Sequence, residues 1–167
     1  MKVIFSHGKE SGPWGSKITK LANVAKELGF DVDSIDYTGI TSPDERVIKL
    51  NNYLNNETKS YILVGSSMGG YVSLVVAQTN KPLGTFLLAP ALFMTDYEQQ
   101  TYTIDLKQLE IVHGWSDDII PVAHSIKYAQ QAQCSLHLID GDHRLNSSIE
   151  QVMGLFQVFL KNINDSM

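Results

Sequence analysis

Cysteine is almost absent from this sequence, as are long apolar runs and any excess of positive charge. The single cysteine, Cys134, cannot form an intramolecular disulfide and has no neighbours at zinc-ligand spacing. The apolar run at Val3–Phe5 is too short for a signal peptide, and no later run reaches the length of a membrane span. We therefore expect a cytoplasmic protein in a reducing compartment, with no membrane partner.

The charge balance bears on the class of partner. The 167 residues include 13 basic and 18 acidic side chains, a net charge of -5. This is the wrong sign for holding a phosphate backbone by charge, so we expect no nucleic-acid partner. The length fits one domain over residues 1–167, and the 43% hydrophobic content is enough to bury a core.

Short β-branched and apolar runs alternate with helical patterns, which is typical of βαβ units and a mostly parallel sheet. The expected strands are Lys2–Ser6, Phe30–Asp36, Ser60–Gly65, Gly84–Ala89, Leu109–His113 and Ser135–Asp140. Helical spacing predicts helices over Ser16–Leu28, from a Ser42 cap to Leu54, and over Ser67–Gln78, Pro121–Gln133 and Ser147–Leu160. Several strands are continuous apolar runs, which predicts helices on both faces of the sheet. The segment Leu92–Gln108 lacks a period and is expected to be a loop or one short helix.

The strongest local signal is Gly65-Ser66-Ser67-Met68-Gly69, a Gly-x-Ser-x-Gly sequence between an expected strand and an expected helix. Such a sharp turn strains the serine backbone, needs glycines beside it, and exposes the hydroxyl at the carboxyl end of the sheet. The helix N-terminus there favours negative charge developing on a substrate. We predict that Ser67 is a nucleophile. Ser66, one residue early, is the rival, and we interpret it as a hydrogen-bonding neighbour.

A serine nucleophile requires a base and an acid, which in this arrangement follow it in the order acid, then histidine. Asp117 comes after the fifth expected strand and His143 after the sixth. Parallel strands end at one edge of a sheet, so Ser67, Asp117 and His143 are expected to meet there. His143 would accept and return the Ser67 proton, while Asp117 would orient the imidazole and stabilise its cation.

The acid has a rival, and the oxyanion needs donors. Asp118 is the alternative acid, although it could instead cap the following helix. We interpret Asp142 as a carboxylate that is either solvated or braces its loop. A tetrahedral oxyanion requires two backbone N–H donors. We expect one from Met68, directly after the nucleophile, and one from the loop Ser6–Pro13, where Lys9 is the candidate.

Other residues receive weaker assignments. Four aromatic residues fall in loops near the expected active edge and are candidates for an acyl or alcohol pocket: Trp14, Tyr97, Tyr102 and Trp115. His7 and His113, each before a glycine at a strand end, are interpreted as packed structural histidines. His124 and His137 lack a partner at metal-ligand spacing, so we expect neither a metal nor a cofactor.

Four segments in order resemble the α/β-hydrolase superfamily: the loop beginning at His7-Gly8, the elbow Val64–Tyr71, the segment His113–Pro121 and the pair Asp142-His143. The small size and the Gly-Ser-Ser-x-Gly-Gly-Tyr elbow are most similar to lidless YqiA-type esterases. This resemblance implies a three-layer α/β/α sandwich with a six-stranded, mostly parallel sheet in the order 2-1-3-4-5-6. It also implies hydrolysis of short-chain carboxylic esters, with a small-molecule acyl ester as the partner.

Two further functions compete with the esterase. The same triad could act on a thioester, an amide or an aminoacyl ester, since acyl transfer uses the same residues for each. The chain could also be a binding or interaction protein that retains a hydrolase scaffold. A broken elbow or triad would indicate that last function, and here every part is present.

Overall fold

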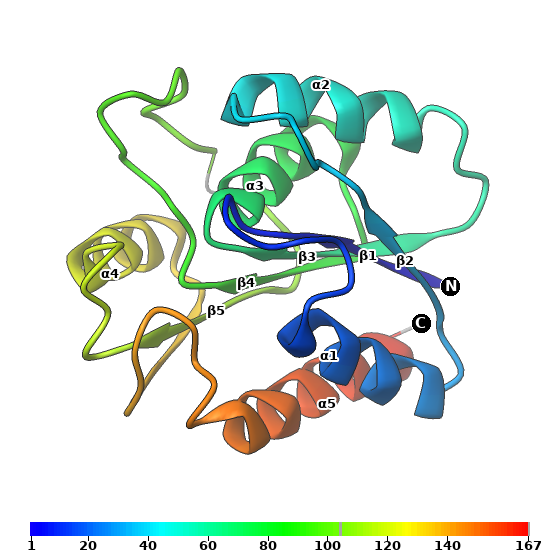
Figure 1. The fold of residues 1–167 in the computed structure, drawn as a ribbon. Coiled ribbons are helices and arrows are strands. Elements are labelled where there is room, and N and C mark those ends of the chain that lie inside the picture. Colours follow the sequence, from blue (N-terminus) through cyan, green and yellow to red (C-terminus); the bar gives the residue numbers. More distant parts are fainter. Residues whose placement is uncertain (104, 167) are drawn as a thin grey trace.

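The computed structural model describes residues 1–103 and 105–166, and these form one sheet of six parallel strands (Figure 1). The strands lie in the order β2-β1-β3-β4-β5-β6. They are β1 (Lys2–Ser6), β2 (Asp31–Ile35), β3 (Tyr61–Ser66), β4 (Gly84–Leu88), β5 (Leu109–Gly114) and β6 (Ser135–Ile139). The helices are α1 (Ser16–Glu27), α2 (Pro43–Leu54), α3 (Met68–Asn80), α4 (Val122–Ala132) and α5 (Ile149–Asp165). The expected strand order and three-layer architecture are confirmed.

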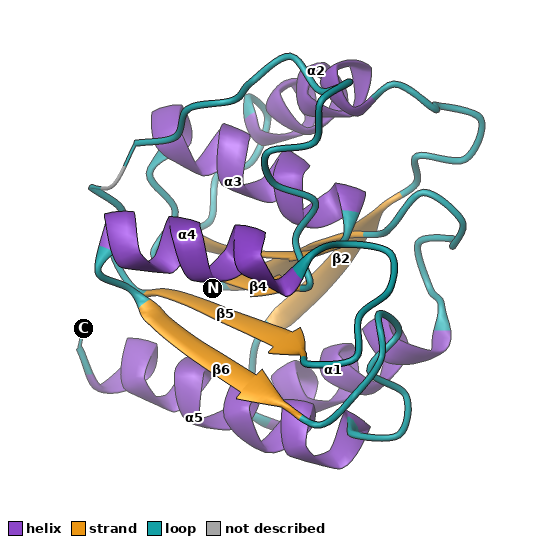
Figure 2. Cartoon of the chain, turned by 90° about the vertical axis from the view of Figure 1, so that its left-hand side faces the viewer, coloured by secondary structure: helices purple, strands orange, loops and turns teal. Residues whose placement is uncertain are grey.

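Helices cover both faces of the sheet, and each face has its own core. Figure 2 shows α1 and α5 on one side and α2, α3 and α4 on the other. Successive side chains of a strand point to opposite faces, so Val3 and Phe5 enter the α1/α5 core while Ile4 enters the α2/α3 core. All three are fully buried, which explains why this strand is a continuous apolar run.

Strand register brings the loops with chemical groups together at the carboxyl edge. Ser6 of β1 pairs with Gly65 of β3, so the loop after β1 starts beside the serine turn. Gly114 of β5 pairs with Ile139 of β6, so the two loops that follow these strands are also neighbours. The sheet thus arranges four loops from distant parts of the sequence around one site.

Most elements begin and end within two residues of the expected positions, but one helix ends well beyond its expected range, and the structure settles one open alternative. Helix α5 continues to Asp165, beyond the expected Leu160, because Ile163 extends its buried apolar stripe. The described part of 92–108 consists of turns and loop without a helix. Its Tyr97 and Tyr102 pack edge-on against Tyr71 of α3, with ring centroids 4.8 and 6.4 Å away. Within the described ranges, no helix is long and apolar enough to cross a membrane.

Candidate active site

Ser67 lies in a strained turn between β3 and α3. Its backbone has φ 55° and ψ -118°, a conformation that L-residues disfavour. Main-chain hydrogen bonds maintain it: the Ser67 N–H donates to the Leu88 carbonyl at 2.9 Å, and the Ser67 carbonyl accepts from Ala91 N–H at 3.0 Å. The turn is therefore fixed from β4 and the segment after it.

Glycines make this turn sterically accessible. A Cβ on Gly65 would lie 2.2 Å from the Gly69 carbonyl oxygen, and a Cβ on Gly69 would lie 2.0 Å from the Ser6 carbonyl oxygen. Real Cβ atoms do not approach oxygen so closely, so both positions need glycine in this backbone. The Gly-x-Ser-x-Gly spacing thus lets α3 begin directly against β1.

The structure brings the three predicted catalytic side chains into one hydrogen-bonded row. His143 Nε2 lies 3.0 Å from Ser67 Oγ, and His143 Nδ1 lies 2.8 Å from Asp117 Oδ2. The carboxylate accepts only, so Nδ1 carries the proton and Nε2 is the acceptor that faces the serine hydroxyl. This arrangement can remove the serine proton during attack on an acyl carbon.

Three N–H groups donate to Asp117. Oδ1 accepts from the N–H groups of Ile119 and Ile120 at 2.9 and 2.8 Å, and Oδ2 accepts from His143 Nδ1 at 2.8 Å. His113 Nε2 lies 2.9 Å from Oδ2, while its N–H donates to the Ile120 carbonyl at 3.1 Å. Burial alone raises the pKa of Asp117, but the hydrogen bonds from His143, Ile120 and Ile119 outweigh it and lower the pKa below its usual value. The acid is thus kept ionised and aimed at the imidazole.

Two other carboxylates near the site make different contacts. Asp118 is exposed on the rim, and within the part of the chain that the structure describes it forms no hydrogen bond to His143. Asp142 Oδ1 accepts from the N–H groups of Arg144 and Leu145 at 3.0 and 2.9 Å. Asp142 therefore has the loop-bracing contacts that the sequence predicts.

His113 has a contact that the sequence interpretation missed. It is fully buried, with Nδ1 2.7 Å from Ser125 Oγ and Nε2 near both Asp117 and the Ile120 carbonyl. Because Nε2 faces two acceptors it carries the proton, and burial lowers the pKa of His113, which favours this neutral form. The four-residue spacing between His113 and Asp117 is the signal that would have suggested this contact.

The loops after β5 and β6 approach closely at Gly114. A Cβ there would lie 2.2 Å from the Gly141 carbonyl oxygen and 2.9 Å from the Asp142 carbonyl oxygen. This close approach lets the loop with Asp117 reach the loop with His143.

Met68 and Lys9, the two residues predicted to provide oxyanion donors, line the same cleft as Ser67. Met68 is the first residue of α3, where a helix leaves its N–H groups without intrahelical acceptors. Gly8 brings the other loop close, since a Cβ on it would lie 3.4 Å from Ser67 Cβ. Considering residues 1–103 and 105–166, neither Met68 N–H nor Lys9 N–H donates to a protein acceptor. Both are therefore available to a ligand.

These groups open into a cleft of about 780 Å³. Ser67, Met68, His143 and Lys9 line it, together with the predicted substrate residue Tyr97. The cleft wall also includes Lys17, whose Nζ donates to the Arg144 carbonyl at 3.1 Å. Burial lowers the pKa of Lys17 to about 8, although the charges of Asp142 and Asp117 oppose this shift.

Three predicted pocket aromatics do not line the cleft. Tyr102 points into an aromatic cluster instead, with its ring 5.3 Å from that of Phe93 and 5.7 Å from that of Tyr128. Trp14 and Trp115 stand on the surface with 49% and 58% exposure. An aromatic residue in a loop can close the core or face solvent, so loop position alone did not identify the lining.

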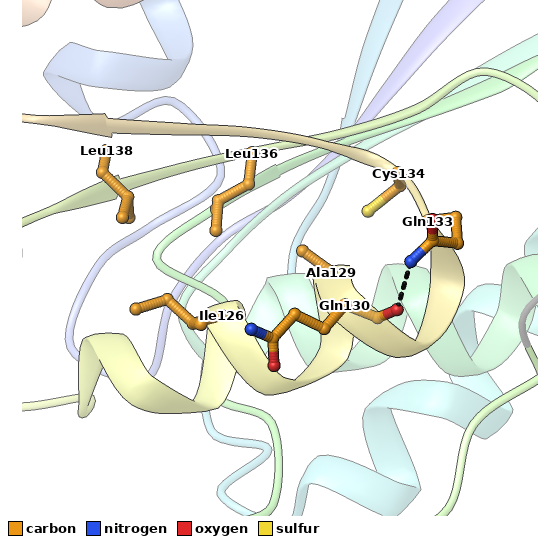
Figure 3. Close-up of a pocket in the computed structure, with 7 residues that line it drawn as sticks. All are labelled: Ile126, Ala129, Gln130, Gln133, Cys134, Leu136 and Leu138. Carbon is orange, nitrogen blue, oxygen red and sulfur yellow. Dashed lines mark hydrogen bonds between the residues drawn. The ribbon is translucent and has the colours of Figure 1, made fainter.

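A second cavity of about 460 Å³ lies between α4 and β6 (Figure 3). Its side chains are mostly apolar and include no serine or histidine; the lining comprises Ile126, Ala129, Gln130, Gln133, Cys134, Leu136 and Leu138. Burial raises the pKa of the Cys134 thiol to about 11, which keeps it protonated and unreactive at neutral pH. This second cavity lacks the groups for acyl transfer.

Among the described residues, no three His, Cys, Asp or Glu side chains are arranged to hold a metal ion.

Solved structures similar to this chain share the α/β-hydrolase fold. A protein from Xanthomonas campestris pv. campestris placed in the α/β superfamily of hydrolases is 29% identical, with a TM-score of 0.88 over 96% of this chain and 98% of its own. Est1E from Butyrivibrio proteoclasticus is 17% identical, with a TM-score of 0.82 over 98% and 88% of the two chains. A lidless α/β serine hydrolase from Xanthomonas campestris is 19% identical, with a TM-score of 0.68 over 96% and 81%.

Sequence comparison agrees with this fold. No curated protein sequence matches the chain. A family model, by contrast, matches residues 2–163, which is nearly the whole chain. The predicted resemblance to small, lidless, YqiA-type α/β hydrolases is thereby confirmed. The strand order, the serine turn and this match together show that the chain belongs to the uncharacterised protein family UPF0227, within the α/β-hydrolase superfamily.

Proposed function

We propose that this protein is a serine hydrolase that cleaves small, short-chain carboxylic esters through an acyl-enzyme on Ser67. The observation that carries the proposal is the row of hydrogen bonds from Asp117 through His143 to Ser67, at 2.8 and 3.0 Å. Its support is geometric: the Asp117 carboxylate accepts from His143 Nδ1, which leaves Nε2 facing the Ser67 hydroxyl. Similarity to α/β hydrolases adds to it.

The proposed mechanism follows from the positions of the two His143 nitrogens, one beside the Ser67 hydroxyl and the other beside the Asp117 carboxylate. His143 Nε2 takes the hydroxyl proton as Ser67 Oγ attacks the acyl carbon, and Asp117 stabilises the imidazolium that forms. The oxyanion accepts hydrogen bonds from the Met68 and Lys9 N–H groups. His143 then gives the proton to the departing alcohol. A water molecule next attacks the acyl carbon and loses a proton to His143 Nε2. The acid leaves as His143 returns this proton to Ser67 Oγ.

The cleft supports a small substrate. Its volume of about 780 Å³ lies within the range of pockets that bind small molecules. A structural neighbour, Est1E, has been observed with ferulic acid bound. Aromatic acyl groups of similar size therefore belong in a substrate panel, beside acetyl and butyryl esters, thioesters and amides.

Turnover of p-nitrophenyl acetate and labelling by a fluorophosphonate probe test the proposal. Ser67→Ala is expected to lower kcat by about 10⁴-fold or more, since triad serines contribute on that order. Ser66→Ala is the matched control, because it removes the neighbouring hydroxyl and is expected to retain labelling. Folded wild-type protein that is neither labelled nor active on any ester, thioester or amide would contradict the proposal and favour a binding protein.

The proposal also places the enzyme in the cytoplasm. One cysteine and the absence of a long apolar run in the sequence support a reducing compartment without membrane insertion. Cell fractionation checks this, and recovery of the labelled protein with membranes or outside the cell would contradict it.

A further inference from the structure

Arg46, in the first turn of α2, is a buried cation directed at main-chain oxygens behind the active site. Arg46 is only 2% exposed to solvent. Nε donates to the Ile40 carbonyl at 2.7 Å, and Nη1 donates to the carbonyls of His7 and Gly8 at 3.1 and 3.2 Å. Among the described residues it forms no ion pair, and its guanidinium lies 5.1 Å from the Tyr37 ring centroid. A buried charge is costly, so these oxygens are its main compensation.

The Gly8 carbonyl is held from a second side by His7. His7 Nε2 accepts from Tyr37 N–H at 3.0 Å, which leaves the ring proton on Nδ1. Nδ1 then donates to the Gly8 carbonyl at 2.8 Å. Burial lowers the pKa of His7, which favours this neutral tautomer. Two donors, one on α2 and one on the neighbouring residue of the same loop, therefore fix the direction of the Gly8 carbonyl.

The Gly8 carbonyl and the Lys9 N–H belong to the same peptide group. In a trans peptide the C=O and N–H bonds point in opposite directions. With the carbonyl turned toward Arg46, the Lys9 N–H points away from it, and Lys9 lines the cleft with Ser67. Gly8 would otherwise rotate easily, because glycine has access to a wide range of backbone conformations.

We propose that Arg46 is a positioning residue that locks the Gly8–Lys9 peptide with its N–H directed at the oxyanion. This inference rests on the proposed acyl transfer through Ser67. Arg46 acts through the peptide and touches no substrate. A charge-assisted bond to the carbonyl also polarises the amide, so the Lys9 N–H becomes a stronger donor.

Kinetics separate positioning from a merely structural role. Losing one oxyanion donor costs about 10²–10³-fold in kcat, and a loosened donor costs less, so Arg46→Met is expected to lower kcat about 10- to 100-fold. KM for p-nitrophenyl acetate should stay within about two-fold, because the neutral carbonyl of the ground state uses the donor weakly. Added guanidinium should restore part of kcat to Arg46→Ala. Arg46→Lys should fall between, since an ammonium lacks the planar fork.

Lys49→Met is the matched control on the same helix. Its ammonium also donates to a main-chain carbonyl, that of Asp36 at 2.6 Å, but at an exposed site. Its kcat should equal that of wild type. If Arg46→Met keeps full kcat while wild type is active, the inference is overturned and the proposed function stands.

A crystal structure of Arg46→Met provides a readout without activity. The expected result is a rotated Gly8–Lys9 peptide beside an unchanged row of Asp117, His143 and Ser67. An unrotated peptide overturns the inference even if wild type proves inactive and the proposed function fails. If Arg46→Met does not fold, Arg46→Lys serves in both measurements, and wild-type kcat with an unrotated peptide again overturns the inference.

Discussion

The contribution of Asp117 to the stability of the fold depends on pH. Its lowered pKa means that folding favours the carboxylate, so its stabilising contribution is present above the unfolded pKa of about 3.9 and is lost as pH falls through the lower, folded pKa. The gap in Tm between wild type and Asp117→Asn should therefore be widest near neutral pH and narrow below about pH 4. Thermal melts at a series of pH values measure it.

The same substitution tests the choice of acid. Asp117→Asn should lower kcat by about 10⁴-fold, because an amide no longer holds the imidazole in the required tautomer. Asp118→Asn, on the exposed rim, should stay within a few-fold of wild type and keep its pH dependence of Tm. If Asp118→Asn shows the larger loss of kcat, the acid has been assigned to the wrong residue.

For individual residues, the sequence predicts the side chains that belong to motifs and misses those whose roles depend on contacts with residues distant in the sequence. Ser67, Asp117 and His143 each follow a strand, so the parallel sheet alone predicts that they meet. Arg46 lies in the polar first turn of a helix, where an arginine usually faces solvent. Its contacts to His7 and Gly8 span 39 and 38 residues, which no local pattern encodes.

The close approach of the loops that follow β5 and β6 depends on the missing side chain of Gly114. Gly114→Ala would place a Cβ 2.2 Å from the Gly141 carbonyl oxygen and force the loops apart. We expect a loss of about 1–3 kcal/mol in the free energy of unfolding, as for other overpacked sites. Separating Asp117 from His143 should also lower kcat about 10- to 100-fold. Chemical denaturation and ester turnover measure the two effects.

Gly154→Ala is the matched control for this substitution. Gly154 is exposed within α5, and a Cβ there meets nothing within 4 Å. Alanine in a helix is favoured over glycine by about 0.5–1 kcal/mol, so this variant should be more stable with unchanged kcat. Equal behaviour of the two variants would show that the loop contact does not matter.

Element boundaries were predictable where a cap or a buried stripe marked them. Strand β1 has the predicted range Lys2–Ser6, and Ser42 caps α2 by accepting from Glu45 N–H, as predicted. The final turn of α5 was missed because Lys161 and Asn162 dilute the apolar pattern before Ile163. The sequence does not decide between loop and helix for the segment between β4 and β5, because packing against Tyr71, rather than local periodicity, determines its course.

The whole molecule depends on two cores, and Phe156 is central to the one under α1 and α5. Its ring lies 5.1 Å from that of Phe86 and 6.3 Å from that of Phe5, and it is fully buried. Phe156→Ala should lower the free energy of unfolding by about 3–5 kcal/mol. Urea denaturation measures this loss. kcat per folded molecule should be unchanged, since the ring of Phe156 packs against other core aromatics, Phe5, Phe86 and Phe159.

A residue two positions later on the same helix provides the comparison. Val158 is 56% exposed, so Val158→Ala should change the free energy of unfolding by less than about 0.5 kcal/mol. Similar losses in the two variants would contradict the division into core and surface. The overall architecture was predictable because the central strands β1, β3 and β4 are apolar on both faces, which requires helices on both sides.

A ribosome delivers the serine turn and the loop after β1 well before the histidine. His143 follows Ser67 by 76 residues, which takes roughly 4 to 15 seconds at typical rates of synthesis. Until β6 has emerged and added its edge to β5, the serine hydroxyl has no base beside it. Under the proposed function, the nascent chain would therefore carry an unactivated serine, and reactivity toward acyl compounds would appear only when nearly all of the protein has been made and β6 has paired with β5.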